Sequence, residues 1–199
     1  MSDYLHNQTV KYMSHEDDNP SWKNGQIRFI NHFLLPILDA RGLVSRILDA
    51  GCGDGAGLTY MGELGFYNTT GVDFSPEKLA RASDQGNLVL KADLHQLPFV
   101  APMFDVVYSS HALEHCHSPE VVVAEFVRVA KEDADFIIVV PFPDTGPEDA
   151  HCGSQAMGTR SGDLRTVTDW FRARGLEVQE VRLDSKREPE VWLHLRRRA

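Results

Sequence analysis

Short apolar runs alternate with segments of helical periodicity over most of this chain. Apolar residues recur every three or four positions from Gln26 to Ala40, which predicts an amphipathic helix that ends before Gly42. Farther along, runs rich in valine, isoleucine and phenylalanine predict five strands, because each is short and is followed by turn-forming residues. These strands are expected at residues 47–48, 69–72, 87–90, 104–108 and 136–140.

Segments with helix signals separate these strands. The chain reads Ser-Pro-Glu at residues 75–77 and again at 118–120, and a serine cap followed by proline in the first turn is typical of a helix start. Further helices are expected at residues 56–64 and from about residue 163 to 174. Strands joined by helices indicate a mainly parallel sheet with helices on both faces.

The C-terminal end predicts a hairpin, since residues 176–183 and 190–195 both alternate between apolar and polar positions. The pattern therefore predicts an α/β fold with a doubly wound, seven-stranded sheet, mainly parallel, in which the hairpin adds one antiparallel strand at an edge. Two stretches lack periodicity. The polar residues 1–25 are expected to form an N-terminal arm and to be a candidate lid, and residues 141–162 to form a long loop.

Composition narrows the class of protein. With 199 residues, 42% of them hydrophobic and 25% charged, the chain is long enough for one globular domain, expected at residues 26–199. Its net charge of -9 opposes nonspecific attraction to nucleic acid or to anionic membranes. Apolar stretches are too short for a membrane span or a signal peptide, and the 3 cysteines give no disulfide framework. A cytoplasmic protein is expected.

The most informative chemistry follows the first predicted strand, where residues 49–55 read Asp-Ala-Gly-Cys-Gly-Asp-Gly. Glycines at a strand end let backbone N–H groups approach a ligand closely, and ligands of doubly wound sheets bind at the carboxyl ends of the strands. Taken alone, the loop is ambiguous. It also satisfies the G-x-G-x-x-A pattern of NAD-binding proteins, with an acidic residue, Asp73, about 20 residues farther on.

Acidic residues follow three predicted strands and favour a different ligand. Asp49 precedes the glycines, and a carboxylate there suits an ammonium group better than a pyrophosphate. Asp73 is placed to accept from the hydroxyl groups of a ribose, with a helix cap as the alternative. Asp93 is placed to accept from the amine of adenine, with Phe74 and Leu94 on either side of the ring, and a turn aspartate is the alternative. Ammonium, ribose and adenine together indicate S-adenosylmethionine.

Four segments in this order resemble the successive motifs of class I S-adenosylmethionine-dependent methyltransferases. The resemblance is greatest to the small branch that includes quinone-biosynthesis methyltransferases. One turn departs from the pattern, because residues 130–135 lack the proline and paired glycines of many relatives, but it lies far from the expected cofactor. The matching segments are residues 47–55, 71–75, 92–94 with 97–99, and 104–109 with 113–115.

This resemblance implies a Rossmann-like fold, S-adenosyl-L-methionine as cofactor, and a set of binding residues. The methionyl part of the cofactor would lie against the backbone of Gly51, Cys52 and Gly53, and its amino group would bind Asp49. The ribose would bind Asp73. The adenine would contact Asp93 and Leu94, and Ser109 would lie beside the sulfonium.

A second pattern, His-x-x-Glu-His at residues 111–115, matches that of some zinc proteases. Those enzymes carry the pattern within a helix, whereas here it lies between a predicted strand and a helix start, so no metal site is expected. An acceptor that must lose a proton needs a base, and a histidine of near-neutral pKa suits that role. His111 is the first candidate catalytic residue and His151 the second, with a purely structural role as the alternative for each.

The sequence therefore predicts a methyltransferase that acts on an oxygen, nitrogen or carbon atom of a small-molecule acceptor. A small acceptor is expected because only the N-terminal arm and residues 141–162 remain to cover it. No nucleic acid or membrane partner is expected. Two alternatives stay open, namely an NAD-dependent oxidoreductase on the same fold and a nucleoside-binding or regulatory protein without turnover.

Overall fold

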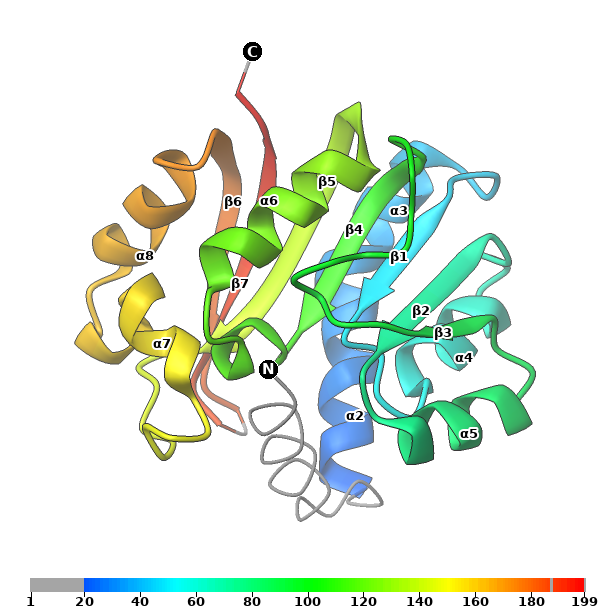
Figure 1. Ribbon diagram of the computed structural model, residues 1–199, viewed down its shortest axis with the longest axis horizontal. Helices are drawn as coiled ribbons and strands as arrows, with labels where there is room; N and C mark the ends of the chain where they lie inside the picture. Colours follow the sequence, from blue (N-terminus) through cyan, green and yellow to red (C-terminus); the bar gives the residue numbers. More distant parts are fainter. Residues whose placement is uncertain (1–19, 187, 199) are drawn as a thin grey trace.

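The computed structural model describes residues 20–186 and 188–198 of the chain. Its centre is a seven-stranded sheet with the strand order β3-β2-β1-β4-β5-β7-β6 (Figure 1). β1 to β5 are parallel, and β7 is antiparallel to both of its neighbours. The strands are β1 Ile47–Ala50, β2 Thr69–Asp73, β3 Val89–Lys91, β4 Phe104–Ser110, β5 Ala130–Pro141, β6 Leu176–Asp184 and β7 Glu190–Arg197.

The predicted doubly wound, mainly parallel sheet with one antiparallel strand is confirmed. The position of that strand differs, because β7 lies between β5 and β6 and is not at the edge. Val191, Leu193 and Leu195 of β7 are all buried, whereas most of β6 is partly or fully exposed. The more apolar strand takes the internal position, since an internal strand is covered by neighbours on both sides.

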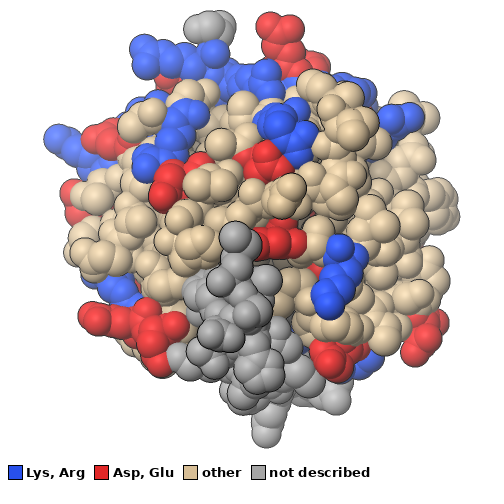
Figure 2. Space-filling view, viewed as in Figure 1, with Lys and Arg blue, Asp and Glu red and all other residues tan. Residues whose placement is uncertain are grey.

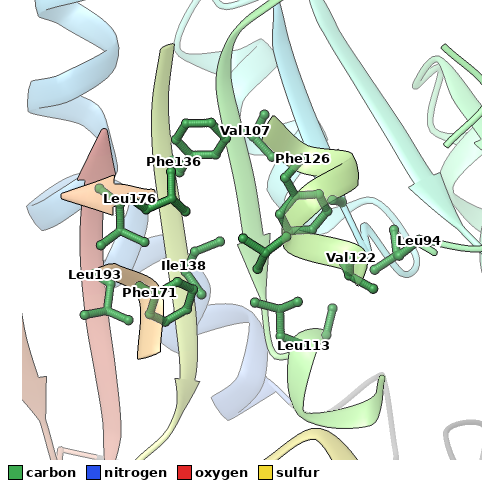
Figure 3. Close-up of a cluster of buried hydrophobic side chains, with 14 of the residues drawn as sticks. Leu94, Val107, Leu113, Val122, Phe126, Phe136, Ile138, Phe171, Leu176 and Leu193 are labelled. Carbon is green, nitrogen blue, oxygen red and sulfur yellow. The ribbon is translucent and has the colours of Figure 1, made fainter. Parts of the chain in front are cut away.

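Helices cover both faces of the sheet (Figure 1). Successive side chains of a strand point to opposite faces, so Ile47 packs in the cluster that includes Phe29 of α2, and Leu48 packs in the cluster beneath α6 and α8. Figure 3 shows this second cluster, where Phe126 and Phe171 lie over the sheet. The α-helices are α2 Pro20–Phe29, α3 Leu35–Arg41, α4 Ala56–Glu63, α5 Pro76–Asp84, α6 Pro119–Val129, α7 Cys152–Met157 and α8 Leu164–Arg172.

The first helix begins earlier than predicted. α2 starts at Pro20, so residues 20–25, which were expected to be irregular, are helical. Proline is tolerated at the first helical position because its missing N–H would have no partner there. Residues 1–19 lie outside the described part of the chain, and an arm or lid there stays a prediction.

A π-helical turn joins α2 to α3. It spans Ile30–Leu34, and the N–H of Leu35 donates to the carbonyl of Ile30 in place of the carbonyl one residue later. Pro36 follows directly and has no N–H to offer the preceding turn, which is a local reason for the shifted hydrogen bonds. The single predicted helix is therefore two helices with a short irregular junction.

Residues 141–162, which were predicted to be one long loop, contain α7 and a short 3-10 turn. Met157 of α7 is fully buried. Gly153 of α7 packs closely against the backbone at Leu113, so that an added Cβ would be 2.3 Å from the carbonyl oxygen of Leu113. The helix was missed because a segment this short carries no periodic pattern, and packing against the rest of the protein stabilises it.

β5 is also longer than predicted and begins at Ala130. Its first residues are charged and read as a turn in the sequence. In the fold, Asp135 is fully buried and accepts from the side chains of Arg41 at 2.6 Å, His194 at 2.7 Å and Arg196 at 2.6 Å. A charged residue enters the sheet here because cations from distant segments surround it.

We expect Gly153→Ala to lower the free energy of unfolding by about 1–3 kcal/mol, because the new methyl group would meet the carbonyl of Leu113 and force the helix to shift. Gly62→Ala is the control, since nothing lies within 4 Å of a Cβ at this helical position, and it should raise stability by about 0.5–1 kcal/mol. Urea unfolding measures both. Equal effects of the two variants would contradict the close packing of α7.

Candidate cofactor and acceptor site

Four predicted site segments meet at the carboxyl end of the parallel strands. β1 is flanked by β2 on one side and β4 on the other, so the strand order reverses between β1 and β4. Ligands of doubly wound sheets bind at such a reversal. The glycine loop after β1, the acidic ends of β2 and β3, and the end of β4 therefore border the same region, as the sequence predicted.

The glycine loop has the backbone conformation that its residues suggest. Gly51 has φ +89°, and an added Cβ would lie 2.5 Å from the Cβ of Ala112. Gly53 also has a positive φ, and its N–H donates to Asp73 Oδ2 at 2.9 Å. Cys52 is different, because its buried sulfur faces Gly71 in the interior. Any ligand contact of Cys52 therefore uses its backbone.

Asp49 is the most informative side chain of the site. It is 1% exposed, and its Oδ2 has no hydrogen-bond partner among the described residues. Burial, and then the negative charge of Asp73, raise the pKa of Asp49 to about 8. When this buried group is ionised, its negative charge has no countercharge among the described residues. An ammonium group at Oδ2 would supply one, so the residue fits the amino group of S-adenosylmethionine.

Asp73 is 2% exposed and joins the two loops beside it. Its Oδ2 accepts from Gly53, and its Oδ1 accepts from the N–H of Ser75 at 2.9 Å. Ser75 itself caps α5 by accepting from the N–H of Lys78. Burial raises the pKa of Asp73 and these backbone hydrogen bonds oppose that shift. Part of the helix-cap alternative is thus present, and a contact of Asp73 with ribose hydroxyls stays a prediction.

At the end of β3, Asp93 Oδ1 accepts from the backbone N–H of His95 at 2.9 Å and contacts its ring Nδ1 at 2.6 Å. The turn-aspartate geometry is therefore present, but it occupies one carboxylate oxygen. Leu94 packs in the hydrophobic cluster near Val122 (Figure 3). Phe74 is only partly buried. Contacts of Phe74 and Leu94 with a purine ring stay a prediction.

Ser109 is 1% exposed, and its hydroxyl donates to the carbonyl oxygen of Ala50 at 2.8 Å. The contact ties the end of β4 to the end of β1, directly before the glycine loop. Its predicted place beside the sulfonium stays a prediction. What the structure adds is a hydrogen bond that fixes the two strand ends relative to each other.

Comparisons with known proteins agree with this geometry. Residues 48–138 match the family described as a methyltransferase domain. Over these residues the chain is similar to class I S-adenosylmethionine-dependent methyltransferases.

Individual relatives show how far the likeness extends. The chain is 34% identical to a malonyl-[acyl-carrier protein] O-methyltransferase of Laribacter hongkongensis over 115 residues, which are 51% of this chain and 39% of the relative. It is 32% identical to a phosphatidylethanolamine N-methyltransferase of Cereibacter sphaeroides over 119 residues, 55% of this chain and 57% of the relative. The chain thus spans about half the length of these relatives or less.

A solved structure has a similar fold over nearly the whole chain. It is the 1,6-didemethyltoxoflavin-N1-methyltransferase of Burkholderia thailandensis with bound 1,6-didemethyltoxoflavin and S-adenosylhomocysteine. The TM-score is 0.72 at 19% identity, and the match covers 96% of this chain and 87% of the other. The Rossmann-like methyltransferase fold predicted from the sequence is confirmed, and S-adenosylmethionine is the cofactor of this family.

His111 lies directly after β4 and contacts the first residue of β7. Its ring Nε2 is 2.7 Å from Glu190 Oε2 of β7, and its Nδ1 is 3.3 Å from Glu114 Oε1. Burial lowers the pKa of His111, but hydrogen bonds to the two carboxylates outweigh burial and raise it to about 9. The imidazole is therefore protonated at neutral pH. The catalytic role of His111 stays a prediction, and a charged hydrogen-bond donor fits it better than a proton acceptor.

His151 belongs to a separate cluster on the segment after β5. Its Nδ1 lies 2.8 Å from Asp144 Oδ1, and its ring packs edge-on against His115 with centroids 4.9 Å apart. Burial lowers the pKa of His151, and contact with Asp144 more than offsets this and raises it. His115 contacts the carbonyl oxygen of Ala150 through Nδ1. Structural contacts account for both rings, and catalysis by His151 stays a prediction.

A small cavity of about 20 Å³ lies between α2 and the ends of β4 and β7. Its lining includes Gln26, Arg28, His111 and Glu190. The two carboxylates beside His111 could not be identified from the sequence. Glu190 reads as the start of an edge strand, and Glu114 as part of a metal motif. Gln26 was likewise missed, because nothing in its local sequence indicates that it reaches Tyr108 of β4.

Two further features concern residues 20–186 and 188–198. In that part of the chain, three or more His, Cys, Asp or Glu side chains nowhere gather in an arrangement suited to a metal ion. The helices in the same ranges are too short or too polar to cross a membrane.

The state of Asp49 predicts a pH dependence. Between the pKa of an unfolded aspartate, about 4, and its raised pKa of about 8, only the folded ligand-free protein keeps this proton. Stability therefore falls as the pH rises, by up to about 1.4 kcal/mol per pH unit from this group. Asparagine does not titrate, so we expect Asp49→Asn to lack this pH dependence. Its free energy of unfolding, relative to that of the wild type, should therefore increase from pH 5 to pH 8.

Chemical unfolding at several pH values measures this difference. Asp54→Asn, in the same loop but only partly buried, is the matched control and should keep a constant offset from wild type. A constant offset for Asp49→Asn as well would show that Asp49 is ionised throughout this range.

Proposed function

We propose that this chain transfers the methyl group of S-adenosylmethionine to an oxygen, nitrogen or carbon atom of a small molecule. The observation that carries the proposal is Asp49, whose buried Oδ2 lacks a partner among the described residues beside a glycine loop. A ligand that brings an ammonium group satisfies this atom, whereas the pyrophosphate of NAD would place negative charge beside it. This argues against the oxidoreductase alternative.

The residues of the chain act by binding and positioning. Asp49 receives the amino group, the loop backbone at Gly51 and Gly53 approaches the methionyl part, and Asp73 receives the ribose hydroxyls. Asp93 receives the adenine amine. The bound cofactor supplies a methyl group on a positively charged sulfur. Since displacement at this methyl needs only an aligned nucleophile, positioning is the main contribution of the protein.

His111 has a positioning role beside the small cavity, where the acceptor would bind. As an imidazolium held by Glu114 and Glu190, it keeps the end of β4 attached to β7 next to the cavity. Arg28, which also lines the cavity, is paired with Asp184 through both terminal nitrogens. These cations already have carboxylate partners, which favours an acceptor that is neutral or positively charged.

The two relatives support a range of acceptor atoms, since one is an O-methyltransferase and the other an N-methyltransferase. Acidic and basic side chains are interspersed over the described part of the face in Figure 2, and the net charge is -9. Both features favour a small acceptor over nucleic acid. A cytoplasmic location is part of the same proposal.

Cofactor binding is the first test. We expect S-adenosylmethionine and S-adenosylhomocysteine to raise the melting temperature and NAD to leave it unchanged, because a ligand of the folded state stabilises that state. Asp49→Asn should weaken S-adenosylhomocysteine at least about tenfold, the loss of a charge-assisted hydrogen bond. Asp54→Asn should bind as wild type does. Stabilisation by NAD alone would overturn the proposal.

Methyl transfer is the second test. With methyl-labelled S-adenosylmethionine and fractionated cell extract, we expect label in the small-molecule fraction. His111→Gln should lower the rate at least about tenfold through lost alignment while S-adenosylhomocysteine binding is kept, and His32→Gln, at an exposed position, should not. Label only in protein or RNA would overturn the small-molecule acceptor. Cofactor binding without any labelled product would instead favour the protein without turnover.

A further inference from the structure

The ring of His95 contacts the aspartate that the proposed function assigns to adenine. We propose that His95 is a positioning residue that fixes Asp93 for recognition of a 6-amino purine. In this role it controls discrimination between purines more than overall affinity. This inference rests on the proposed function, because it concerns the same cofactor.

Two donors from one residue hold the same oxygen of Asp93. The backbone N–H of His95 lies 2.9 Å from Oδ1 and its ring Nδ1 lies 2.6 Å from the same atom. The N–H of Gln96 donates to the backbone carbonyl of Asp93 at 2.9 Å and closes the turn. With the turn closed and Oδ1 held twice, rotation of the carboxylate would break both contacts.

A third contact indicates the tautomer of the His95 ring. The backbone N–H of Ser118 donates to Nε2 at 3.4 Å, so Nε2 acts as the acceptor and Nδ1 carries the hydrogen. That tautomer donates to Asp93. The ring also stacks on His117 with centroids 4.0 Å apart, and the side chain of His95 is only 13% exposed. The contact with the N–H of Ser118, directly before α6, therefore sets the orientation of the ring.

This arrangement leaves the second oxygen of Asp93 for a ligand. Among the described residues, Oδ2 accepts no hydrogen bond, and the side chain is 24% exposed at the carboxyl end of β3. The exocyclic amine of adenine is a donor that matches a carboxylate oxygen. A 6-oxo purine presents an acceptor at the same place, and two facing acceptors repel each other. A fixed Asp93 should therefore reject the 6-oxo ring.

The test compares S-adenosylhomocysteine with S-inosylhomocysteine, which differ at the purine 6-position, by isothermal titration calorimetry. We expect wild type to prefer the adenosyl compound at least about tenfold. His95→Ala should reduce this preference to less than about threefold and leave the affinity for the inosyl compound within about twofold of wild type. His95→Asn should restore most of the preference, since its amide N–H can donate at the position of Nδ1.

His117→Ala is the matched control, because it removes the stacked ring and leaves both His95 donors to Asp93 in place, and it should keep the wild-type preference. A His95→Ala variant that loses affinity for both ligands equally, or that keeps the full preference, would overturn the positioning role. Should His95→Ala fail to fold, His95→Phe takes its place, because it keeps a ring at this position but has no side-chain donor. Its preference must fall in the same way, and an unchanged preference would overturn the inference. Wild type that binds neither ligand would overturn the proposed function, and this inference with it.

Discussion

Two buried carboxylates at the carboxyl end of adjacent strands determine how this site is built. Asp73 uses its oxygens to hold the glycine loop at Gly53 and the start of α5 at Ser75. Asp49 lies nearby with an oxygen that lacks a partner among the described residues, and the charge of Asp73 helps to raise its pKa. A folded protein tolerates such a pair when one carboxylate is protonated or a cation is bound. The fold therefore favours a protonated Asp49 at neutral pH, at the place where a cationic ligand would favour its ionised form.

The opposite side of the site depends on a different charge arrangement. His111 joins β4 to β7 through Glu190 and to the following turn through Glu114. Because β7 lies between β5 and β6, this ion pair places Glu190 of the C-terminal hairpin next to the carboxyl end of β4. A histidine between two carboxylates is a stable cation over a wide pH range. Its contacts with both carboxylates hold the ring at the junction of β4 and β7.

Several features of the site could be predicted because they depend on local sequence. The glycine loop was recognisable from its backbone requirement, and φ +89° at Gly51 with no room for a Cβ is the reason for glycine there. The Ser-Pro-Glu signals marked the starts of α5 and α6. The features that were missed depend on partners distant in the chain. Asp135 enters β5 only because Arg41, His194 and Arg196 surround it, and α7 exists because it packs against the segment around Leu113.

The sequence by itself determined the fold class, the cofactor family and the place of the binding loops. All three follow from short-range patterns, namely strand and helix periodicity, glycines at a strand end, and acidic residues at fixed positions after strands. Only the tertiary structure decided the electrostatic state of each group. His111 looked like a base of near-neutral pKa until Glu114 and Glu190 were placed beside it. Charge and burial depend on which distant side chains come together, and a linear pattern does not contain that information.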